Sequence, residues 1–290
     1  MSEEIAVLGT GTMGQGIAQV AASKGYRTIV YDVSADRARA AIDAIAAVTE
    51  KLVQKSKLTE GDRTALLSRL SMGSDVGKAV ECASVVIEAA PEDMGLKVAL
   101  FEKVVAAAPK HALLGSNTSS LSLTELGTRI GEAHRTVGLH FFNPPPVMEL
   151  LEIVRGLATS EETLTRAQEL AGKLGKTPII VRDTPGFATS RLGVILGAEA
   201  IRMLESGVAS VVDIDRAMEL GYRHPMGPLK LTDLVGLDVR LAILDHLHKE
   251  VGEQFRAPPL LRTMVRAGKL GKKSGEGFYV WRDGVPSIKS

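Results

Sequence analysis

The chain has 290 residues, of which 45% are hydrophobic and 24% charged, and its formal net charge is +1. These values are typical of a globular protein with a large core, and the length suits two domains. They exclude a strongly basic surface, so we expect neither nucleic acid nor an anionic membrane as a partner. Any anionic ligand must be met by a local site.

The cysteine count and the hydropathy pattern bear on the compartment. Cys82 is the only cysteine, which rules out a disulfide within the chain and favours a reducing compartment. A strand pattern begins at residue 4, so we expect no leader peptide. No apolar run reaches the roughly 18 residues that a membrane span needs. The sequence therefore predicts a cytoplasmic protein.

The first half of the chain alternates short apolar segments with longer helical patterns. Strands are expected at residues 5–8, 28–32, 84–89, 113–116, 136–142, 149–154 and 178–183. Helices are expected at residues 13–24, 35–55, 63–70 and 96–108. Strands that alternate with helices form βαβ units, so the predicted fold class is α/β, with a Rossmann-type, doubly wound parallel sheet covered on both faces.

The second part of the chain is expected to be a smaller, all-helical domain. Helical patterns cover residues 187–205, 210–220, 229–251 and 260–267, and they follow the turn at Pro185. Ser210 or Asp213 is a suitable N-cap, and Gly221 and Gly268 suit helix ends. We therefore place the domain boundary between residues 184 and 185, giving domains 1–184 and 185–290.

A glycine-rich segment joins the first strand to the first helix, and its sequence is Gly9-Thr10-Gly11-Thr12-Met13-Gly14. In this pattern Gly9 permits the tight turn, Gly11 lets the backbone approach a pyrophosphate, and Gly14 allows helix and strand to pack closely. The positive helix start then faces the phosphates. The spacing and its position predict a dinucleotide-binding site in residues 1–184.

An acidic residue follows at the expected distance. Asp32 stands 21 positions after Gly11, at the end of the second predicted strand. A carboxylate there accepts hydrogen bonds from the adenosine ribose and repels a 2′-phosphate, so NAD is favoured over NADP. Arg37 and Arg39 leave an opening for NADP, and Asp32 could instead simply cap the next helix.

A histidine and a glutamate, His140 and Glu152, lie twelve positions apart in two predicted strands joined by a proline-rich turn. If the strands lie side by side, Glu152 can hold the imidazole in one tautomer and stabilise its protonated form. That arrangement makes a general base. A histidine that only packs or caps a strand is the alternative interpretation.

Three polar clusters follow predicted strands: residues 88–92, residues 116–120, and His140 with Asn143. Ligands of doubly wound sheets bind outside the carboxyl ends of the strands, so these clusters are expected at one crevice. No set of His, Cys or carboxylate residues has metal-ligand spacing, so no metal is expected.

At these residues the sequence resembles the L-3-hydroxyacyl-CoA dehydrogenase family, especially its bacterial 3-hydroxybutyryl-CoA dehydrogenases. The resemblance spans essentially the whole chain. It rests on GTGTMGQGIAQ at 9–19, the 88–92 cluster, SNTSS at 116–120, GLHFFNP at 138–144, DTPGF at 183–187, HPMGP at 224–228, DLVGLD at 233–238 and GKKSGEGFY at 271–279.

The resemblance implies NAD-dependent oxidation of an (S)-3-hydroxyacyl-CoA of short chain, such as 3-hydroxybutyryl-CoA, to the 3-oxoacyl-CoA, and the reverse reduction. His140 would be the general base and acid, oriented by Glu152, with Ser119 beside the reacting oxygen. It also implies a homodimer formed through the helical domain. Besides Asp32 and residues 9–14, the implied cofactor contacts are Ala89, Glu92, Lys97, Ser119, Asn143 and Lys273, and the implied substrate contacts are Ser119, Asn143, Ser190 and, for CoA, Lys55.

One position departs from the family pattern. Many members have Asn followed by Arg after the PGF motif, whereas this chain has Ser190-Arg191. Our hypothesis is that Ser190 fills the role of that asparagine directly or through a water molecule. Lys55 lies in a basic cluster with Lys51 and Lys57 that a solvated helix face explains equally well.

Two alternatives remain at this point: a dehydrogenase of a sugar acid such as gulonate on the same fold, and a non-catalytic NAD-binding protein. The sequence does not specify acyl chain length, residual use of NADP or the direction used in the cell. It is equally compatible with fermentation, polyester synthesis and fatty-acid or aromatic-acid breakdown.

Overall fold

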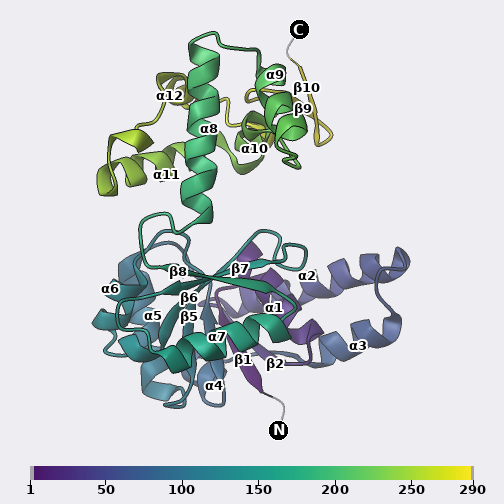
Figure 1. The fold of residues 1–290 in the computed structure, drawn as a ribbon. Coiled ribbons are helices and arrows are strands. Elements are labelled where there is room, and N and C mark those ends of the chain that lie inside the picture. The colour runs from purple at the N-terminus through teal and green to yellow at the C-terminus, as the bar shows by residue number, and fades with distance from the viewer. Residues whose placement is uncertain (1–2, 289–290) are drawn as a thin grey trace. The chain divides into compact units, whose positions relative to one another are not determined.

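The computed structural model describes residues 3–288, and the chain divides into two compact units, Met1–Thr184 and Pro185–Ser290. The first unit contains a large sheet with helices, and the second is mainly helical (Figure 1). The α/β fold class and the helical second domain that the sequence predicts are both confirmed.

The first unit is built on an eight-stranded sheet in the order β3-β2-β1-β4-β5-β6-β7-β8. Strands β2 and β3 are added on one side of β1, and the later strands from β4 onward on its other side, which is the strand order of a doubly wound fold. The strands are β1 (Glu4–Leu8), β2 (Arg27–Tyr31), β3 (Leu70–Met72), β4 (Val85–Glu88), β5 (Leu113–Ser116), β6 (Thr136–Phe141), β7 (Leu150–Arg155) and β8 (Thr177–Arg182).

The sheet is not parallel throughout. Strands β1 to β6 pair in parallel, whereas β6 and β7 are antiparallel, and β8 pairs in parallel with β7. The parallel pairing expected from the βαβ units is confirmed for β1 to β6, and the sheet changes direction only between β6 and β7. The turn between β6 and β7 is too short for a crossover helix, so the chain must return beside β6 in the opposite direction.

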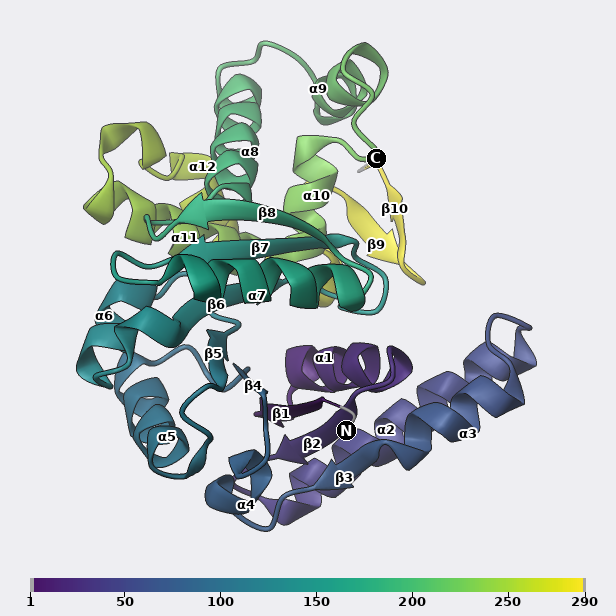
Figure 2. The ribbon, with the colours of Figure 1, turned by 60° about the horizontal axis from the view of Figure 1, so that its bottom comes forward.

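Helices cover both faces of this sheet. Buried side chains of α1, α2, α3 and α7 share one hydrophobic cluster with the strands, while α4, α5 and α6 lie on the opposite side (Figure 2). The helices are α1 (Thr12–Ser23), α2 (Ala35–Gln54), α3 (Glu60–Ser68), α4 (Val76–Val80), α5 (Met94–Ala107), α6 (Leu123–Arg129) and α7 (Glu161–Lys173), with a short 3₁₀ turn, η1 (Ala133–Arg135).

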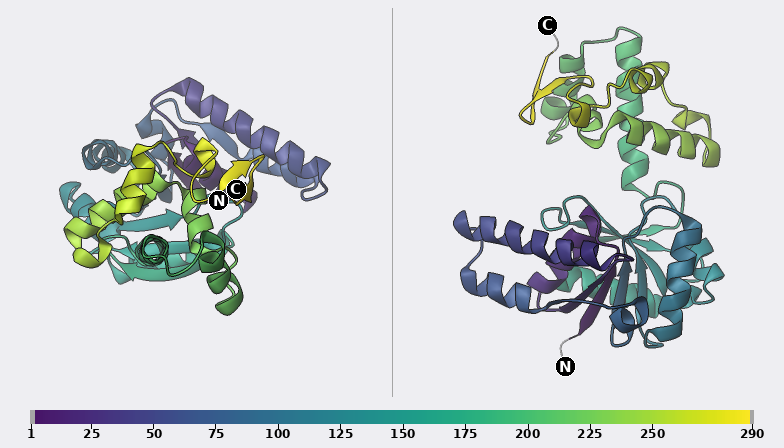
Figure 3. Two further views of the ribbon diagram at one scale, coloured as in Figure 1. Left: turned by 90° about the horizontal axis from the view of Figure 1, so that it is seen from above. Right: turned by 180° about the vertical axis from the view of Figure 1, so that it is seen from behind.

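Helices α2 and α3 form a hairpin that projects beyond the sheet (Figure 3). Lys55 is the C-cap residue of α2 and is exposed near the tip of this hairpin. The position is reachable by a large soluble ligand, although it equally suits a solvated helix end.

The second unit packs helices around α8 (Thr189–Glu205), with a core that includes Val194, Leu237 and Leu244. Its other elements are α9 (Val211–Arg216), the π-helix η2 (Ala217–Gly221), α10 (Pro228–Val235), α11 (Leu237–Glu250), η3 (Glu253–Phe255), α12 (Pro259–Arg266) and η4 (Lys272–Ser274). A two-stranded antiparallel hairpin of β9 (Val280–Arg282) and β10 (Val285–Ser287) was not predicted.

The single helix expected over residues 229–251 was also wrong, because it is broken into α10 and α11 at Gly236. This glycine has φ of +107°, outside the helical range and readily adopted only without a Cβ atom. Ser210 is the N-cap of α9, where its side chain accepts from the backbone N–H of Asp213. Within residues 3–288, no helix combines the length and apolar character that a membrane span requires.

Candidate active site

The glycine-rich turn lies between β1 and α1, and at two of its positions the neighbouring backbone atoms leave room only for glycine. Gly9 has φ of +98°, and a Cβ atom there would lie 2.6 Å from the carbonyl oxygen of Ala89. At Gly14 a Cβ would lie 1.8 Å from the carbonyl oxygen of Gly9, so helix and turn touch. Only glycine allows this contact.

Gly11 is different, because a Cβ atom there would have no protein atom within 4 Å. Gly11 is also the N-cap residue of α1, and no side chain caps the first N–H groups of that helix. Open space beside the positive end of a twelve-residue helix is what a pyrophosphate needs. The turn therefore fits the diphosphate of a dinucleotide.

Asp32 follows β2 and lies beside the same turn. Its Oδ2 accepts from the Thr10 backbone N–H at 3.0 Å and from the Thr10 hydroxyl at 2.8 Å, and its Oδ1 accepts from the N–H of Ser34 at 3.3 Å. Burial acts to raise the pKa of the Asp32 carboxyl, but these hydrogen bonds outweigh it and hold the pKa below its usual value. The carboxylate is thus ionised at neutral pH.

The alternative that Asp32 caps the next helix does not hold. The N-cap residue of α2 is Ser34, whose side chain accepts from the N–H of Arg37. Arg37 and Arg39 are both exposed on the first turns of α2. Asp32 therefore does not cap α2, and its carboxylate is a hydrogen-bond acceptor beside the glycine-rich turn.

His140 and Glu152 stand directly opposite each other in the antiparallel pair of β6 and β7. Nδ1 of His140 and Oε2 of Glu152 are 2.7 Å apart, and the Glu152 side chain is fully buried. The imidazole also packs against the Phe142 ring, with centroids 4.5 Å apart. A neutral ring that donates from Nδ1 carries its basic lone pair on Nε2, so the glutamate selects the tautomer.

The turn between these two strands is anchored at several points. Pro145 packs against α1 so closely that a Cβ at Gly16 would lie 2.6 Å from the proline ring. The Lys176 ammonium donates to the carbonyl oxygens of Pro145 at 2.6 Å and of Met148 at 2.7 Å. Asn143 begins the turn, precedes a cis proline and is exposed. These contacts fix the backbone that carries Asn143.

Asn117 links the ends of three strands. Its Oδ1 accepts from the N–H of Phe141 at 2.9 Å, and its own N–H donates to the carbonyl oxygen of Glu88 at 2.8 Å. The ends of β4, β5 and β6 are thereby tied together beside His140. The sequence places Asn117 in a polar cluster but does not indicate this linking role.

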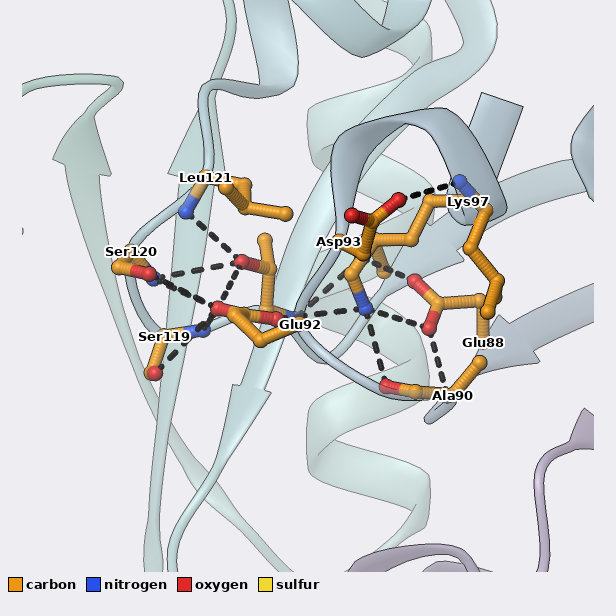
Figure 4. Close-up of polar contacts among 11 residues, drawn as sticks. Glu88, Ala90, Glu92, Asp93, Lys97, Ser119, Ser120 and Leu121 are labelled. Carbon is orange, nitrogen blue, oxygen red and sulfur yellow. Dashed lines mark hydrogen bonds and ion pairs between the residues drawn. The ribbon is translucent and has the colours of Figure 1, made fainter. Parts of the chain in front are cut away.

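Glu92 gathers the loop that follows β5 (Figure 4). Its Oε1 accepts from the Thr118 hydroxyl at 2.6 Å and from the backbone N–H groups of Ser119 at 2.9 Å and Ser120 at 3.1 Å. Burial acts to raise the pKa of Glu92, but these hydrogen bonds and the Lys97 ammonium outweigh it and lower the pKa. The exposed Ser119 is held in place by this carboxylate.

Lys97 lies inside the unit rather than at an open surface. Its side chain is 1% exposed, and its ammonium donates to Oε1 of Glu88 at 2.6 Å and to the carbonyl oxygen of Ala90 at 3.2 Å. Oε2 of Glu88 in turn accepts from the Ser116 hydroxyl at 2.5 Å. This buried ion pair therefore fixes the loop that continues from Ala89, which is half-buried beside Gly14.

The remaining predicted residues belong to the second unit. Ser190 is the second residue of α8 and is half-buried. The ammonium of Lys273, in η4, is paired with the Asp238 carboxylate at 2.6 Å. Burial acts to raise the pKa of Asp238, but the bond to Lys273 outweighs it and lowers the pKa. In the described part of the chain, no group of three or more His, Cys, Asp or Glu is arranged to hold a metal.

Comparison with known proteins decides the family. Residues 4–184 match the model described as 3-hydroxyacyl-CoA dehydrogenase, NAD binding domain, and residues 186–281 match the model of the C-terminal domain. The chain belongs to the 3-hydroxyacyl-CoA dehydrogenase family. As a member of it, the protein is an NAD-dependent oxidoreductase.

Several relatives align over nearly the whole chain. A probable 3-hydroxybutyryl-CoA dehydrogenase of Bacillus subtilis is 43% identical over 97% of this chain and 98% of its own length. A 3-hydroxyadipyl-CoA dehydrogenase of Escherichia coli is also 43% identical, over 97% of this chain and 59% of its own length. The solved (S)-3-hydroxybutyryl-CoA dehydrogenase of Ralstonia eutropha has a TM-score of 0.93 at 38% identity, covering 98% of this chain and all of that one.

Proposed function

We propose that the protein oxidises the C3 hydroxyl of short-chain (S)-3-hydroxyacyl-CoA thioesters, 3-hydroxybutyryl-CoA among them, and catalyses the reverse reduction. The observation that carries this proposal is the buried His140–Glu152 pair on β6 and β7, in the same sheet whose strand β1 leads into the glycine-rich cofactor turn. We further propose a cytoplasmic homodimer formed through the helical unit and a role in fatty acid metabolism.

The bound cofactor supplies the hydride acceptor, and the chain supplies the site that holds it. The N–H groups at the start of α1, which no side chain caps, would hold the diphosphate, and Asp32 would accept from the ribose hydroxyls. Thr10, Thr12 and Met13 line this turn. Ala89, Glu92, Ser119 and Asn143 are the further contacts that we propose.

Lys97 is proposed to act on the cofactor indirectly. Its ammonium bonds to Glu88, Ala90 and Glu92 in the interior, so it positions the loop after β4 and does not contact a ligand directly. Lys273 is proposed as a contact from the second unit, where its charge is balanced by Asp238.

His140 is the proposed catalytic base and acid. In oxidation Nε2 takes the proton of the C3 hydroxyl, and the ring becomes an imidazolium whose Nδ1–H bonds to the Glu152 carboxylate. In reduction the ring returns that proton to the C3 oxygen. The buried carboxylate stabilises the charged ring in both directions, because it lies 2.7 Å from Nδ1.

Two serines are proposed to contact the substrate. The Ser119 backbone N–H is fixed by Glu92, whereas its exposed hydroxyl makes only a long bond of 3.4 Å to the same carboxylate, so the hydroxyl can turn and donate to the reacting oxygen instead. Ser190 replaces the family asparagine at the thioester carbonyl, directly or through a water molecule. Lys55, at the tip of the α2–α3 hairpin, is the proposed contact to CoA.

The function is tested by kcat/KM for acetoacetyl-CoA reduction and for gulonate oxidation, each with both nicotinamide cofactors. The proposal expects turnover of the thioester with NADH and none of the sugar acid. The sugar-acid alternative is not favoured, because both units match 3-hydroxyacyl-CoA dehydrogenase models. NADH binding without turnover of any acyl-CoA would support the non-catalytic alternative.

The role of Ser190 has its own test. Loss of one useful hydrogen-bond donor costs about tenfold or more, so Ser190→Ala should lower kcat/KM by at least that factor. A decrease of less than about threefold would exclude the role. Ser206→Ala, on an exposed hydroxyl after the end of the same helix, is the matched control.

A further inference from the structure

Arg240, on the first turns of α11, is a buried cation without a counter-ion. Its residue is 7% exposed, and its Nε has no hydrogen-bond acceptor. Across residues 3–288 no carboxylate forms an ion pair with it. Burial lowers the pKa of its guanidinium to about 10, so the group still carries its charge at neutral pH.

The carboxylates of the elements around Arg240 are already engaged. Helices α8, α10 and α11 pack against one another in the second unit (Figure 1). Their acidic side chains have other partners: Glu199 pairs with Arg202, Glu205 with the N–H of Leu260, Asp233 with Phe278, Tyr279 and Trp281, Asp238 with Lys273, Asp245 with Arg262, and Glu250 with Lys249. Rotation of a neighbouring acid would therefore break an existing bond.

An unpaired buried charge is unfavourable, because no ion pair or hydrogen bond offsets the free energy of hydration that the group loses on burial. Proteins keep such a group where a ligand completes it, and a guanidinium is suited to a carboxylate or a phosphate, which it can bind through two parallel hydrogen bonds. We therefore expect Arg240 to bind an anion that is not part of the described chain.

The neighbours of Arg240 indicate what carries this anion. Its terminal nitrogen lies 3.3 Å from the position that a Cβ of Gly193 would occupy on α8. Ser190 precedes Gly193 by one helical turn, on the same face of α8. Val194, Leu237 and Leu244, which are almost fully buried, are the adjoining apolar residues on the two helices. An anion at the end of an apolar chain fits these surroundings better than a hydrated CoA phosphate.

We propose that Arg240 binds a carboxylate at the far end of the acyl chain, so that the protein prefers dicarboxylic 3-hydroxyacyl-CoA substrates of about six carbons. The proposal rests on the proposed function, in which Ser190 contacts the thioester carbonyl. The five bonds from that carbonyl to the terminal carboxyl span about 6 Å when extended, because a bond of about 1.5 Å at a tetrahedral angle advances the chain by about 1.25 Å. Ser190 and Gly193 are about 4.5 Å apart along α8, at about 1.5 Å per residue, and the Arg240 terminal nitrogen lies a further 3.3 Å from the Cβ position of Gly193, so a chain of this length can reach from one group to the other.

Binding without turnover gives the first test. Adipyl-CoA and hexanoyl-CoA have equal chain length and lack the C3 hydroxyl, so calorimetry compares them directly. We expect adipyl-CoA to bind the native protein roughly 10- to 100-fold more tightly, and Arg240→Met to abolish the difference. If the variant weakens both ligands and free CoA equally, the anion is a CoA phosphate and the proposal is wrong.

Turnover gives the second test, with kcat/KM for 3-hydroxyadipyl-CoA and 3-hydroxyhexanoyl-CoA. Native protein should prefer the diacid by about tenfold or more, Arg240→Lys should keep part of the preference, and Arg240→Met should lose it. The control Arg256→Met, at an exposed arginine of the same unit, should change neither value. Equal native rates would refute this inference alone, whereas no turnover of either thioester would refute the proposed function.

Two further readouts exclude a purely structural role. Because removal of an unpaired buried charge relieves its desolvation cost, Arg240→Met should keep or raise the melting temperature of the free protein. If it instead unfolds the protein, the lysine variant carries the test. Weakened self-association with an unchanged diacid preference would show that Arg240 pairs with a second copy of the chain, and would overturn the proposal.

Discussion

Replacing Glu152 by glutamine should slow the reaction strongly without much effect on substrate binding. The change keeps the size of the side chain but removes the charge that faces Nδ1 of His140 at 2.7 Å. At an effective dielectric constant of about 20, the gross attraction between the charged partners is about 6 kcal/mol. Both groups are nearly buried, so lost hydration offsets much of this attraction.

The net contribution of a charge-assisted hydrogen bond is about 1.5–3 kcal/mol, which corresponds to a decrease in kcat of roughly 10- to 150-fold. The effect falls on kcat because the imidazolium exists only after the proton has moved. KM for 3-hydroxybutyryl-CoA should therefore stay within about threefold of the native value.

The assay is NADH formation at saturating NAD across a range of thioester concentrations. Glu149→Gln is the matched control, because this glutamate is exposed and lies just before the same strand. A Glu152→Gln protein with kcat within about threefold of native would refute the orienting role. A loss equal to that of the control would refute it as well.

Three further predictions concern the cofactor site. Gly11→Ala should change the melting temperature by less than about 2 °C, because its Cβ meets no protein atom, yet it should weaken NAD binding at least about tenfold. Gly14→Ala should lower the melting temperature by several degrees, at about 2–4 °C per kcal/mol, since its Cβ would overlap the Gly9 carbonyl, and equal effects of the two variants on stability would contradict this. Asp32→Ser should reduce the preference for NAD over NADP, measured as the ratio of kcat/KM values, by at least about tenfold, and an unchanged ratio would remove Asp32 from ribose recognition. The pKa of Glu92 is lowered in the folded state, so its contribution to stability is present above its ordinary pKa of 4.5 and disappears as pH falls through the folded value. Glu92→Gln should therefore lower the melting temperature at about pH 7 and lower it less at about pH 3. Equal losses at both pH values would disprove the stabilising role of the Glu92 carboxylate.

The sequence predicts the fold well where local pattern and spacing act together. The glycine turn, Asp32 and the opposed pair of His140 and Glu152 all follow from short segments between predictable strands. Strand β3 and helix α4 were missed, since three and five residues give too little periodicity. Helix α6, with seven residues, and helix α7, with thirteen, were missed as well. The break at Gly236 was missed because apolar spacing continues across it, while the backbone angle does not.

The part of the site that the sequence could not predict depends on contacts between distant residues. Lys176 looks like a solvated lysine after a helix, yet its ammonium holds two carbonyls of the turn between β6 and β7. Burial of Lys97 follows only from the carboxylates of Glu88 and Glu92 that surround it. Arg240 gives no signal in the sequence, because only packing shows that its charge lacks a partner.

The central claim is that His140 moves the proton in an NAD-dependent oxidation of a 3-hydroxyacyl-CoA. The most direct test is kcat for 3-hydroxybutyryl-CoA in the native protein and in His140→Gln, together with the dissociation constant of NADH for each. A general base contributes about 10²–10⁴-fold, so the variant should lose at least about 100-fold in kcat while its NADH affinity changes by less than about threefold. A variant that turns over within about threefold of native would contradict the account.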